Sequence, residues 1–188
     1  MDIDGILAKY VTILSPSERH NAVVVLGSFK QYDRIKQIIS QFQEHGLHVI
    51  APSLSKIIEG ENGFSILESD LVVLNQLRIE YPNLSEWDYD EMIEDIFCAH
   101  MQQARYIYIV DEDGYIGQQV ALEIGTVLRN PEIQLYAMEP LNPRLDWDDG
   151  VDYFTGAIWA GTAEQIKTRS PEDFIAQINQ KNEMINNL

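Results

Sequence analysis

The stretch that most constrains the fold runs from Arg105 to Arg129, RYIYIVDEDGYIGQQVALEIGTVLR. Its first part, Tyr106–Val110, is a short run of β-branched and aromatic residues bounded by acidic turn residues, which is typical of a buried strand. Asp113-Gly114 marks a turn, and apolar residues then recur at helical spacing over Gln118–Leu128. We therefore expect a central strand, a glycine-containing loop and a helix that packs on a sheet.

Glu123 interrupts the apolar stripe of this predicted helix. It lies three residues after Val120 and four before Val127, at the edge of the face that should pack on the sheet. A carboxylate buried there without a partner would be costly, so its position indicates a partner or a function. The alternative is a glutamate in the first turns of a helix, where the dipole favours negative charge, that points to water or to an arginine.

The loop before this helix has the features of a ligand-binding loop. Gly114 and Gly117 flank Tyr115 and Ile116. Glycines let backbone N–H groups approach a ligand closely at a helix N-terminus, an arrangement that favours anions. In an open α/β sheet, ligands also bind at the carboxyl ends of the strands. We therefore expect a ligand site around this loop.

The rest of the chain repeats the order of strand and helix. We expect strands at Asn21–Leu26, Leu47–Ala51 and Ile133–Met138, and a helix over about Gln31–Glu44 that stops before Gly46. This βαβ order implies parallel pairing. With 188 residues and 45% hydrophobic content, one domain over residues 1–188 is the simplest account.

Further elements should surround this core. They are an amphipathic helix at about 2–14, an insertion at about 53–88, a helix over Tyr89–Ala104 and a closing helix at about 171–187. The insertion contains a possible short strand at Phe64–Leu67 and a helix that ends before Pro82. It is long enough for a lid or an oligomer contact, and a variable surface excursion is the alternative.

Charge and composition exclude several classes of function. Thirty acidic residues against thirteen basic ones give a formal charge of −17, which disfavours a polynucleotide or an anionic membrane as a partner. A single nucleotide is still compatible, because loop N–H groups and one or two local cations can hold a phosphate. The single cysteine and the lack of a signal or long apolar span lead us to expect a cytoplasmic protein.

Neither a metal nor a cofactor is indicated. The four histidines and Cys98 form no pair with the spacing of a metal site. An acidic loop could hold a cation, but it lacks the EF-hand order, and we expect it to be solvated. Its aspartates are Asp146, Asp148, Asp149 and Asp152. The glycine fingerprints of dinucleotide-binding and P-loop proteins are also missing.

Three segments resemble one known superfamily. DGYIGQQVALEIG resembles the G-Y-I-G-x-x-x-x-x-E-I-G signature of the nucleoside 2-deoxyribosyltransferase-like superfamily, and VVVLGSF and HGLHVIAP resemble its first two strands. The resemblance implies an α/β fold, a doubly wound Rossmann-like or flavodoxin-like three-layer sandwich with a mainly parallel sheet of about five strands. It also implies a reaction at the N-glycosidic bond of nucleosides or their 5'-monophosphates, and a homodimer or larger assembly.

The resemblance also assigns roles to residues. Glu123 would attack the anomeric carbon of the sugar. Ser28 and Lys30 fall where the 2'-deoxynucleoside 5'-phosphate N-hydrolases bind phosphate and sugar, and the alternative for Lys30 is a solvated basic edge. The remaining predicted substrate-binding residues are Gly27, Gly114, Tyr115 and Gly117.

Two positions depart from the pattern of active members. Val24 stands where a tyrosine often contacts the nucleophile, and Tyr32 or Tyr115 could supply that phenol instead. Phe97 stands where an aspartate lies near the nucleobase, and Glu94, Asp95 or His100 could substitute for it. Asp95 and His100 are the candidates for protonating the departing base. The alternative for His100 is a hydrogen-bonded core histidine.

Three functions therefore compete. The first is cleavage or transfer at the N-glycosidic bond through Glu123. The second is a noncatalytic nucleotide-binding or sensing module, which the departures at Val24 and Phe97 favour and in which Glu123 would accept a hydrogen bond from a ribose. The third is a structural or assembly protein whose N-terminal helix and insertion mediate contacts.

Overall fold

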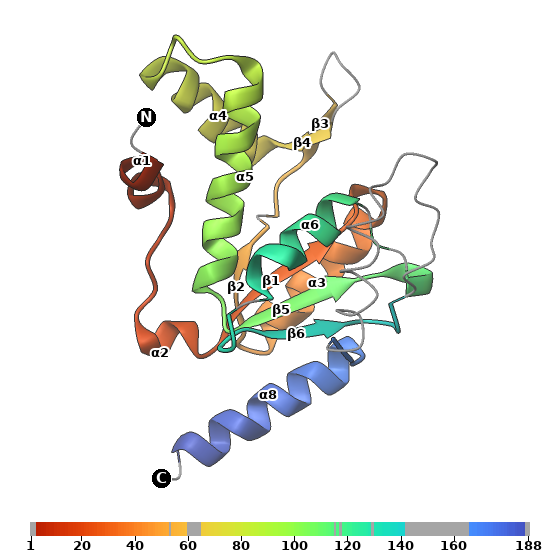
Figure 1. Cartoon of the computed structure of the whole chain (residues 1–188). Coiled ribbons are helices and arrows are strands. Elements are labelled where there is room, and N and C mark those ends of the chain that lie inside the picture. The colour runs from red at the N-terminus through yellow and green to blue at the C-terminus, as the bar shows by residue number, and fades with distance from the viewer. Residues whose placement is uncertain are drawn as a thin grey trace.

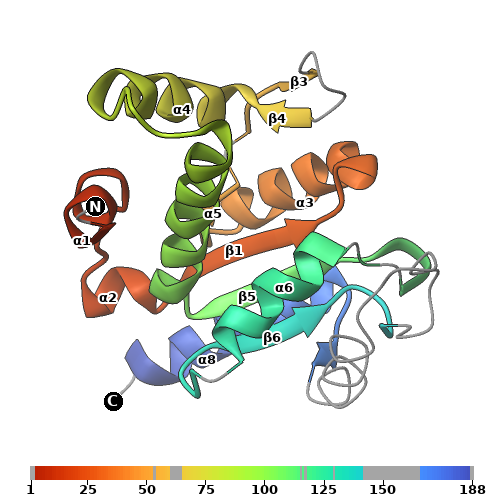
Figure 2. The same cartoon turned by 45° about the horizontal axis from the view of Figure 1, so that its top comes forward.

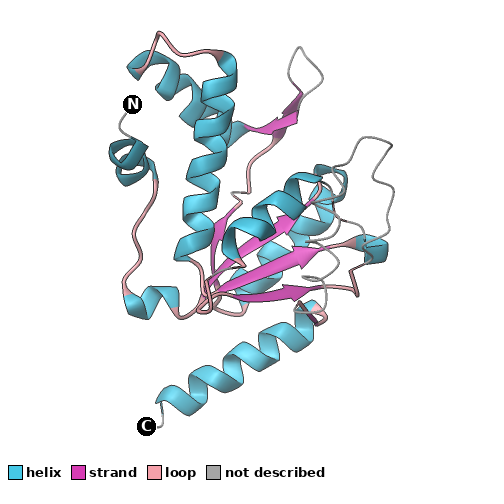
Figure 3. Ribbon diagram, viewed as in Figure 1, coloured by secondary structure: helices cyan, strands magenta, loops and turns pink. Residues whose placement is uncertain are grey.

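A parallel sheet with helices on both faces forms the centre of the protein (Figures 1 and 3). The computed structural model describes residues 3–52, 54–59, 65–114, 116, 118–128, 130–141 and 166–186. The five strands, in the order β2-β1-β5-β6-β7, are all parallel. Their bounds are β1 Ala22–Gly27, β2 His48–Ala51, β5 Tyr106–Val110, β6 Gln134–Ala137 and β7 Lys167–Thr168.

The strand order confirms the predicted doubly wound α/β fold. Counted along the chain, the parallel strands follow the order 2-1-3-4-5, which is that of flavodoxin-like sandwiches. The order reverses between β1 and β5, and in such folds ligands bind outside the carboxyl ends of these strands. Gly27 pairs with Val110 at the ends of the two strands, so the loops that follow them start side by side.

The two central strands are buried because helices cover both of their faces. Residues Ala22 to Leu26 and Tyr106 to Val110 are at most 1% exposed, as near-continuous apolar runs predict for parallel strands. Alternate side chains point to opposite faces. Tyr106 and Tyr108 therefore pack on one side of the sheet, and Ile107 and Ile109 on the other.

Helices α3 (Tyr32–Glu44) and α8 (Pro171–Asn186) cover the aromatic face. Phe174 of α8 lies with its ring centroid 5.0 Å from those of Tyr108 and Tyr136 and 5.1 Å from that of Phe42 in α3. Such aromatic contacts add to the free energy gained by burial. They hold α8 across β5 and β6 (Figure 2).

Helices α5 (Glu86–Gln103) and α6 (Gln118–Val127) cover the opposite, aliphatic face. Val120, Ile124 and Val127 of α6 are buried there, which confirms the predicted apolar stripe. Helix α6 follows β5 closely, as a βα unit should. Glu123 is thus placed on a helix that packs both on the sheet and against α5.

A third apolar cluster lies beyond the sheet. It joins α1 (Ile3–Tyr10), α4 (Glu68–Glu80) and the N-terminal half of α5. In Figure 2, α4 and the hairpin of β3 (Ile57–Glu59) and β4 (Ser65–Leu67) lie at the end of α5 that is away from the sheet. The possible strand predicted near Leu67 therefore belongs to this separate antiparallel hairpin.

Capping boxes explain two wrong helix boundaries. The predicted helix at 2–14 ends at Tyr10, and a separate α2 (Pro16–Arg19) begins after the N-cap Ser15, whose Oγ accepts the Glu18 N–H. Helix α5 begins at Glu86 and not at Tyr89, because Ser85 caps it in the same way. These reciprocal side-chain to backbone bonds satisfy the first N–H groups of a helix.

The remaining comparisons between the predicted and the observed structure concern the edges of the fold. Strand β7, two exposed residues long, was missed, because Lys167-Thr168 carries no apolar pattern. The aspartates of the acidic loop lie outside the described residues. Over the described ranges, no helix has both the length and the apolar character needed to cross a membrane.

Candidate functional site

Glu123 is buried between α6 and α5. It is only 8% exposed, so it does not project into bulk water. No ion pair among the described residues includes it, so the arginine partner of the alternative interpretation is not found there either. Within the part of the chain that the structure describes, the off-pattern glutamate is therefore a buried carboxyl without a cationic partner.

A second carboxyl, that of Glu94 in α5, acts on Glu123. Burial and, to a smaller extent, the nearby charge of Glu94 raise the pKa of Glu123 to about 8, and a hydrogen bond from the Gln119 side chain opposes this rise. The pKa of Glu94 is also raised, chiefly by its own burial, and Cys98 and Gln119 donate hydrogen bonds that lower it. Gln119 thus bridges the two acids.

Helical spacing explains why these four groups meet. Glu94 and Cys98 lie four residues apart on α5, and Gln119 and Glu123 lie four residues apart on α6, so each pair occupies one helix face. The Cys98 thiol lies 3.6 Å from Glu94 Oε1. Burial raises the pKa of this thiol to about 12, so it serves as a neutral donor and not as a nucleophile.

The predicted acids Asp95 and His100 lie elsewhere on α5. At about 100° per residue, Asp95 is turned away from the face that Glu94 presents to α6. The His100 ring bonds to the backbone of Ile96, and its pKa is lowered, chiefly by burial. No hydrogen bond joins either residue to Glu123 within the described ranges, so the structure brings Glu94 to Glu123 instead.

The missing phenol is not replaced by Tyr32. Its hydroxyl donates a 2.6 Å hydrogen bond to the Ser55 carbonyl, and its ring packs in the aromatic cluster on the other side of the sheet from Glu123. Val24 is fully buried on the aliphatic face, with Phe97 packed against the same cluster. Both departures from the superfamily pattern therefore put apolar side chains on the face that carries Glu123.

The loop after β1 holds three predicted ligand residues. A Cβ on Gly27 would lie 2.8 Å from Ile35 Cδ1 and 3.1 Å from the Val110 carbonyl oxygen, so this glycine allows α3 and β5 to approach closely. Ser28 Oγ accepts the Lys30 N–H at 3.3 Å and caps the short helix η1 (Phe29–Gln31). Lys30 is exposed. Their roles in substrate binding stay predictions.

The loop after β5 is fastened to the loop after β1. The Gln31 amide, oriented to satisfy both of its groups, donates to the Val110 carbonyl at 2.8 Å and accepts the Glu112 N–H at 2.9 Å. Asp113 and Gly114 take positive φ values of 58° and 73°, which explains the glycine. The predicted ligand residues Tyr115 and Gly117 lie outside the described residues.

Sequence reasoning missed Asp111, which follows β5 directly. It is 0% exposed, its Oδ1 accepts the Glu139 N–H at 3.1 Å, and its Oδ2 has no hydrogen-bond partner. Burial raises its pKa to about 7. Its position at the end of a fully buried strand was the available signal, but in the sequence Asp111 resembles an ordinary polar turn residue.

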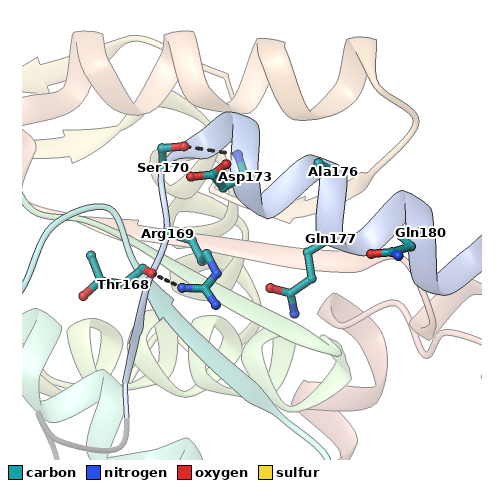
Figure 4. Close-up of a pocket in the computed structure, with 7 residues that line it drawn as sticks. All are labelled: Thr168, Arg169, Ser170, Asp173, Ala176, Gln177 and Gln180. Carbon is teal, nitrogen blue, oxygen red and sulfur yellow. Dashed lines mark hydrogen bonds between the residues drawn. The ribbon is translucent and has the colours of Figure 1, made fainter.

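A groove of about 610 Å³ lies between β7 and α8 (Figure 4). Thr168, Arg169, Ser170, Asp173, Gln177 and Gln180 line it. Because α8 covers the aromatic face, this groove and the Glu123 cluster lie on opposite faces of the sheet. No group of three or more histidines, cysteines or acids that could hold a metal ion occurs within the described ranges.

The fold and the site together define a flavodoxin-like α/β protein with one buried and one half-buried carboxyl between two helices on one face of its sheet. A scan for known protein families, a search of curated proteins and a search of solved structures gave no match. The argument for function therefore rests on the chemistry of this chain and on the resemblance of its motifs.

Proposed function

We propose that the protein cleaves or transfers the N-glycosidic bond of a nucleoside, a deoxynucleoside or its 5'-monophosphate. The observation that carries the proposal is the pair formed by the buried Glu123 and the half-buried Glu94, bridged by Gln119. Retaining glycosyl transfer needs one ionised carboxyl as nucleophile and one protonated carboxyl as acid. The resemblance of the G-Y-I-G and E-I-G motifs supports a nucleoside as the substrate.

In this mechanism the Glu123 carboxylate attacks C1' of the sugar. The bond between C1' and the base nitrogen breaks, its electron pair leaves with the base, and Glu94 gives the base a proton. The product is a glycosyl ester on Glu123. Water then hydrolyses this ester, or a second base takes the sugar and restores the carboxylate.

The raised pKa values fit an acid pair that shares protons. With a pKa of about 8, Glu123 holds a proton at neutral pH. The nucleophile must lose that proton, and Glu94, also raised in pKa, is the neighbouring group that can hold one. We therefore expect the rate of base release to pass through a maximum with pH, falling where both carboxyls are protonated and again where both are ionised.

A noncatalytic nucleotide-binding module is the second candidate. Val24 and Phe97 favour it, because they place apolar groups where active members of the superfamily carry a phenol and a carboxyl. In this case Glu123 would hydrogen-bond a ribose hydroxyl and break no bond. For either function we propose a homodimer or a larger homo-oligomer, which light scattering would measure.

Chromatographic detection of free base tests the proposal. Deoxynucleosides, ribonucleosides and their 5'-monophosphates are incubated with the protein, with and without an acceptor base. Glu123→Gln should reduce base release by about 100-fold or more, whereas Glu91→Gln, an exposed change on α5, should leave it intact. Well-folded protein that releases no base but binds a nucleotide in a Glu123-dependent manner would favour the binding module.

A further inference from the structure

The solvent-facing side of α4 is uncharged and partly apolar. Val72 is 66% exposed and Ile79 is 75% exposed. They lie seven residues, or about two turns, apart and so project from nearly the same side of the helix. We call Val72, Asn75, Gln76 and Ile79 the outer face of α4. The exposed residues between positions 69 and 85 are all uncharged, and they are Val72, Asn75, Gln76, Ile79, Pro82, Asn83 and Ser85.

Ion pairs take up the charges at the margins of this outer face. Glu80 is paired with Lys9 of α1, and Arg78 is paired with Glu86 of α5. Gln76 Nε2 also donates to Glu80 Oε1 at 2.6 Å. Each ion pair is neutral as a whole, so neither leaves a net charge beside the outer face. This neutrality stands out in a chain with a formal charge of −17.

The inner side of α4 is anchored, so the outer face is a fixed surface. Leu74 and Leu77 are buried in the third apolar cluster together with Tyr89 of α5. The guanidinium carbon of Arg78 lies 5.9 Å from the centre of the Tyr89 ring. The core of this cluster is thus built from the inner side of α4, and the exposed Val72 is not part of it.

Trp87 adds a large apolar side chain near the C-terminal end of α4. It is 69% exposed, and it follows Glu86, whose ion pair with Arg78 holds the first turn of α5 against the last turn of α4. Tryptophan is among the residues most enriched at the energetic centres of protein interfaces. Three of the eight large apolar side chains that are exposed among the described residues therefore belong to this corner of the molecule, far from the sheet (Figure 2).

The chemistry of the outer face suits a second copy of the same chain. A two-fold interface brings the residues near its axis against their own copies, so a charged residue there would meet a like charge. The centre of the outer face instead holds Asn75 and Gln76. Their amides carry both donors and acceptors, so each can pair with its own copy. A basic partner would need carboxylates to bind, and the outer face offers none.

We propose that the outer face of α4, with Trp87 at its edge, is the contact between two copies of the chain. The two α4 helices pack antiparallel across a two-fold axis that passes midway between Val72 and Ile79. Each Val72 therefore meets Ile79 of the other copy. The contact is small, so its dissociation constant should be on the order of micromolar. The proposal specifies the homo-oligomer named above and does not depend on the glycosidic reaction.

Sedimentation equilibrium of the full chain tests this contact. The wild type should pass from monomer to dimer as its concentration rises from about 1 to 300 μM. Val72→Glu/Ile79→Glu should weaken dimerisation by about 100-fold or more, because it brings four carboxylates together at the axis. The matched control Ile13→Glu/Met184→Glu adds the same charge at two exposed apolar positions elsewhere and should dimerise as the wild type does. A wild type that stays monomeric, or equal weakening in both double variants, would overturn the proposal.

A pair of opposite charges tests the antiparallel arrangement. Val72→Lys/Ile79→Glu places unlike charges at the two positions that meet across the axis. Within one chain these positions are too far apart to pair, since they are separated by two helical turns. The variant should dimerise at least about tenfold more tightly than Val72→Glu/Ile79→Glu and also more tightly than Val72→Lys/Ile79→Lys. The last variant lowers the net negative charge, so tighter association of that variant would contradict the proposed contact.

The salt dependence of dimerisation gives an independent result. Salt screens the repulsion between two chains that each carry a formal charge of −17. Because the outer face is uncharged, added salt should strengthen dimerisation of the wild type. Dimerisation that weakens with salt would indicate ion pairs across the interface and would overturn the proposal.

Fluorescence locates the contact at Trp87. Its signal is the difference between the wild type and Trp87→Phe. Acrylamide should quench this signal less at concentrations where the dimer forms, because the other copy shields the ring. Equal quenching in monomer and dimer would place the contact elsewhere and overturn the proposal. Glu123→Gln should dimerise as the wild type does, so failure of the dimer and failure of the glycosidic reaction are distinguishable.

Discussion

The two faces of the sheet carry charged side chains of opposite sign, and these respond to pH in different ways. On the aliphatic face, Glu94 and Glu123 can take up protons, and the pKa of Glu123 is raised to about 8. On the aromatic face, Lys181 and Lys167 lie near the rings of Tyr106 and Tyr136, and Arg169 cannot lose its proton in a protein. The acid pair can therefore lose its charge near neutral pH, whereas Arg169 keeps its charge.

The surroundings of the two clusters reinforce this difference. The rings of Tyr106 and Tyr136 face Lys181 and Lys167, and cation–π attraction offsets part of the cost of gathering these charges. On the aliphatic face, Gln119 and Cys98 supply hydrogen bonds to the two carboxyls. A proton-sharing pair of this kind suits acid–base chemistry.

The largest expected effect comes from removing the side chain that holds α8 on the sheet. Phe174 is fully buried among aromatic rings, so Phe174→Ala should reduce the free energy of unfolding by about 3–5 kcal/mol. Urea denaturation measures this loss. The pKa of Glu123, which lies on the opposite face of the sheet, should not change.

Met184→Ala is the matched control for this change. Met184 lies on the same helix but is 56% exposed, so its truncation should alter the free energy of unfolding by under about 0.5 kcal/mol. If Phe174→Ala also shifted the pKa of Glu123 by a full unit, the two faces would not be independent.

The second effect is a pH dependence of stability that Glu123 should cause. Its pKa is raised from 4.5 to about 8 on folding, so the folded state binds more protons than the unfolded state between these values. The contribution of Glu123 to the free energy of unfolding should therefore be greatest below about pH 4.5 and decrease as the pH rises to 8. At about 1.4 kcal/mol per pKa unit, the shift from 4.5 to about 8 means that Glu123→Gln should be more stable than the wild type at pH 8 by up to about 4 kcal/mol.

Denaturation at a series of pH values measures this effect. Asp111 should also make the free energy of unfolding fall with rising pH. Its contribution should end near pH 7, because its pKa is raised to about 7. In Glu123→Gln the free energy of unfolding should therefore still fall with rising pH below pH 7, but it should no longer change between pH 7 and 8. A wild-type stability that rises between pH 5 and 8 would show that Glu123 is paired with a cation in solution.

The sequence predicted local features better than the contacts that join them. The run Tyr106–Val110 identified the central strand at its observed bounds, and the broken apolar stripe marked Glu123 as a buried acid. The partner of Glu123 depends on how α5 and α6 face each other. A shift of one residue, from Asp95 to Glu94, turns the side chain by about 100° around the helix, and no local pattern fixes that angle.

The contacts of Lys167 and Lys181 with aromatic rings could not be predicted, because the partners are far apart in the chain. They form through the pairing of Tyr136 with Lys167 and through the position of α8 over β5 and β6. Strand β7 is two residues long and has no apolar alternation, so this pairing left no pattern in the sequence. Asp111 was missed for a related reason, since its burial comes from neighbouring loops such as that of Glu139.

The smallest expected effect concerns the reactivity of Cys98, which reports on the acid pair without disturbing the fold. Its thiol pKa is raised to about 12 by burial and by the charge of Glu94, so at pH 8 a fraction of about 10⁻⁴ is thiolate. Iodoacetamide should therefore label native Cys98 far more slowly than the same residue in urea. Glu94→Gln should speed labelling only modestly, because burial is the larger cause of the raised thiol pKa. Labelling as fast in the native as in the unfolded protein would show that α5 and α6 separate readily, and the buried acid pair would then lose its structural basis.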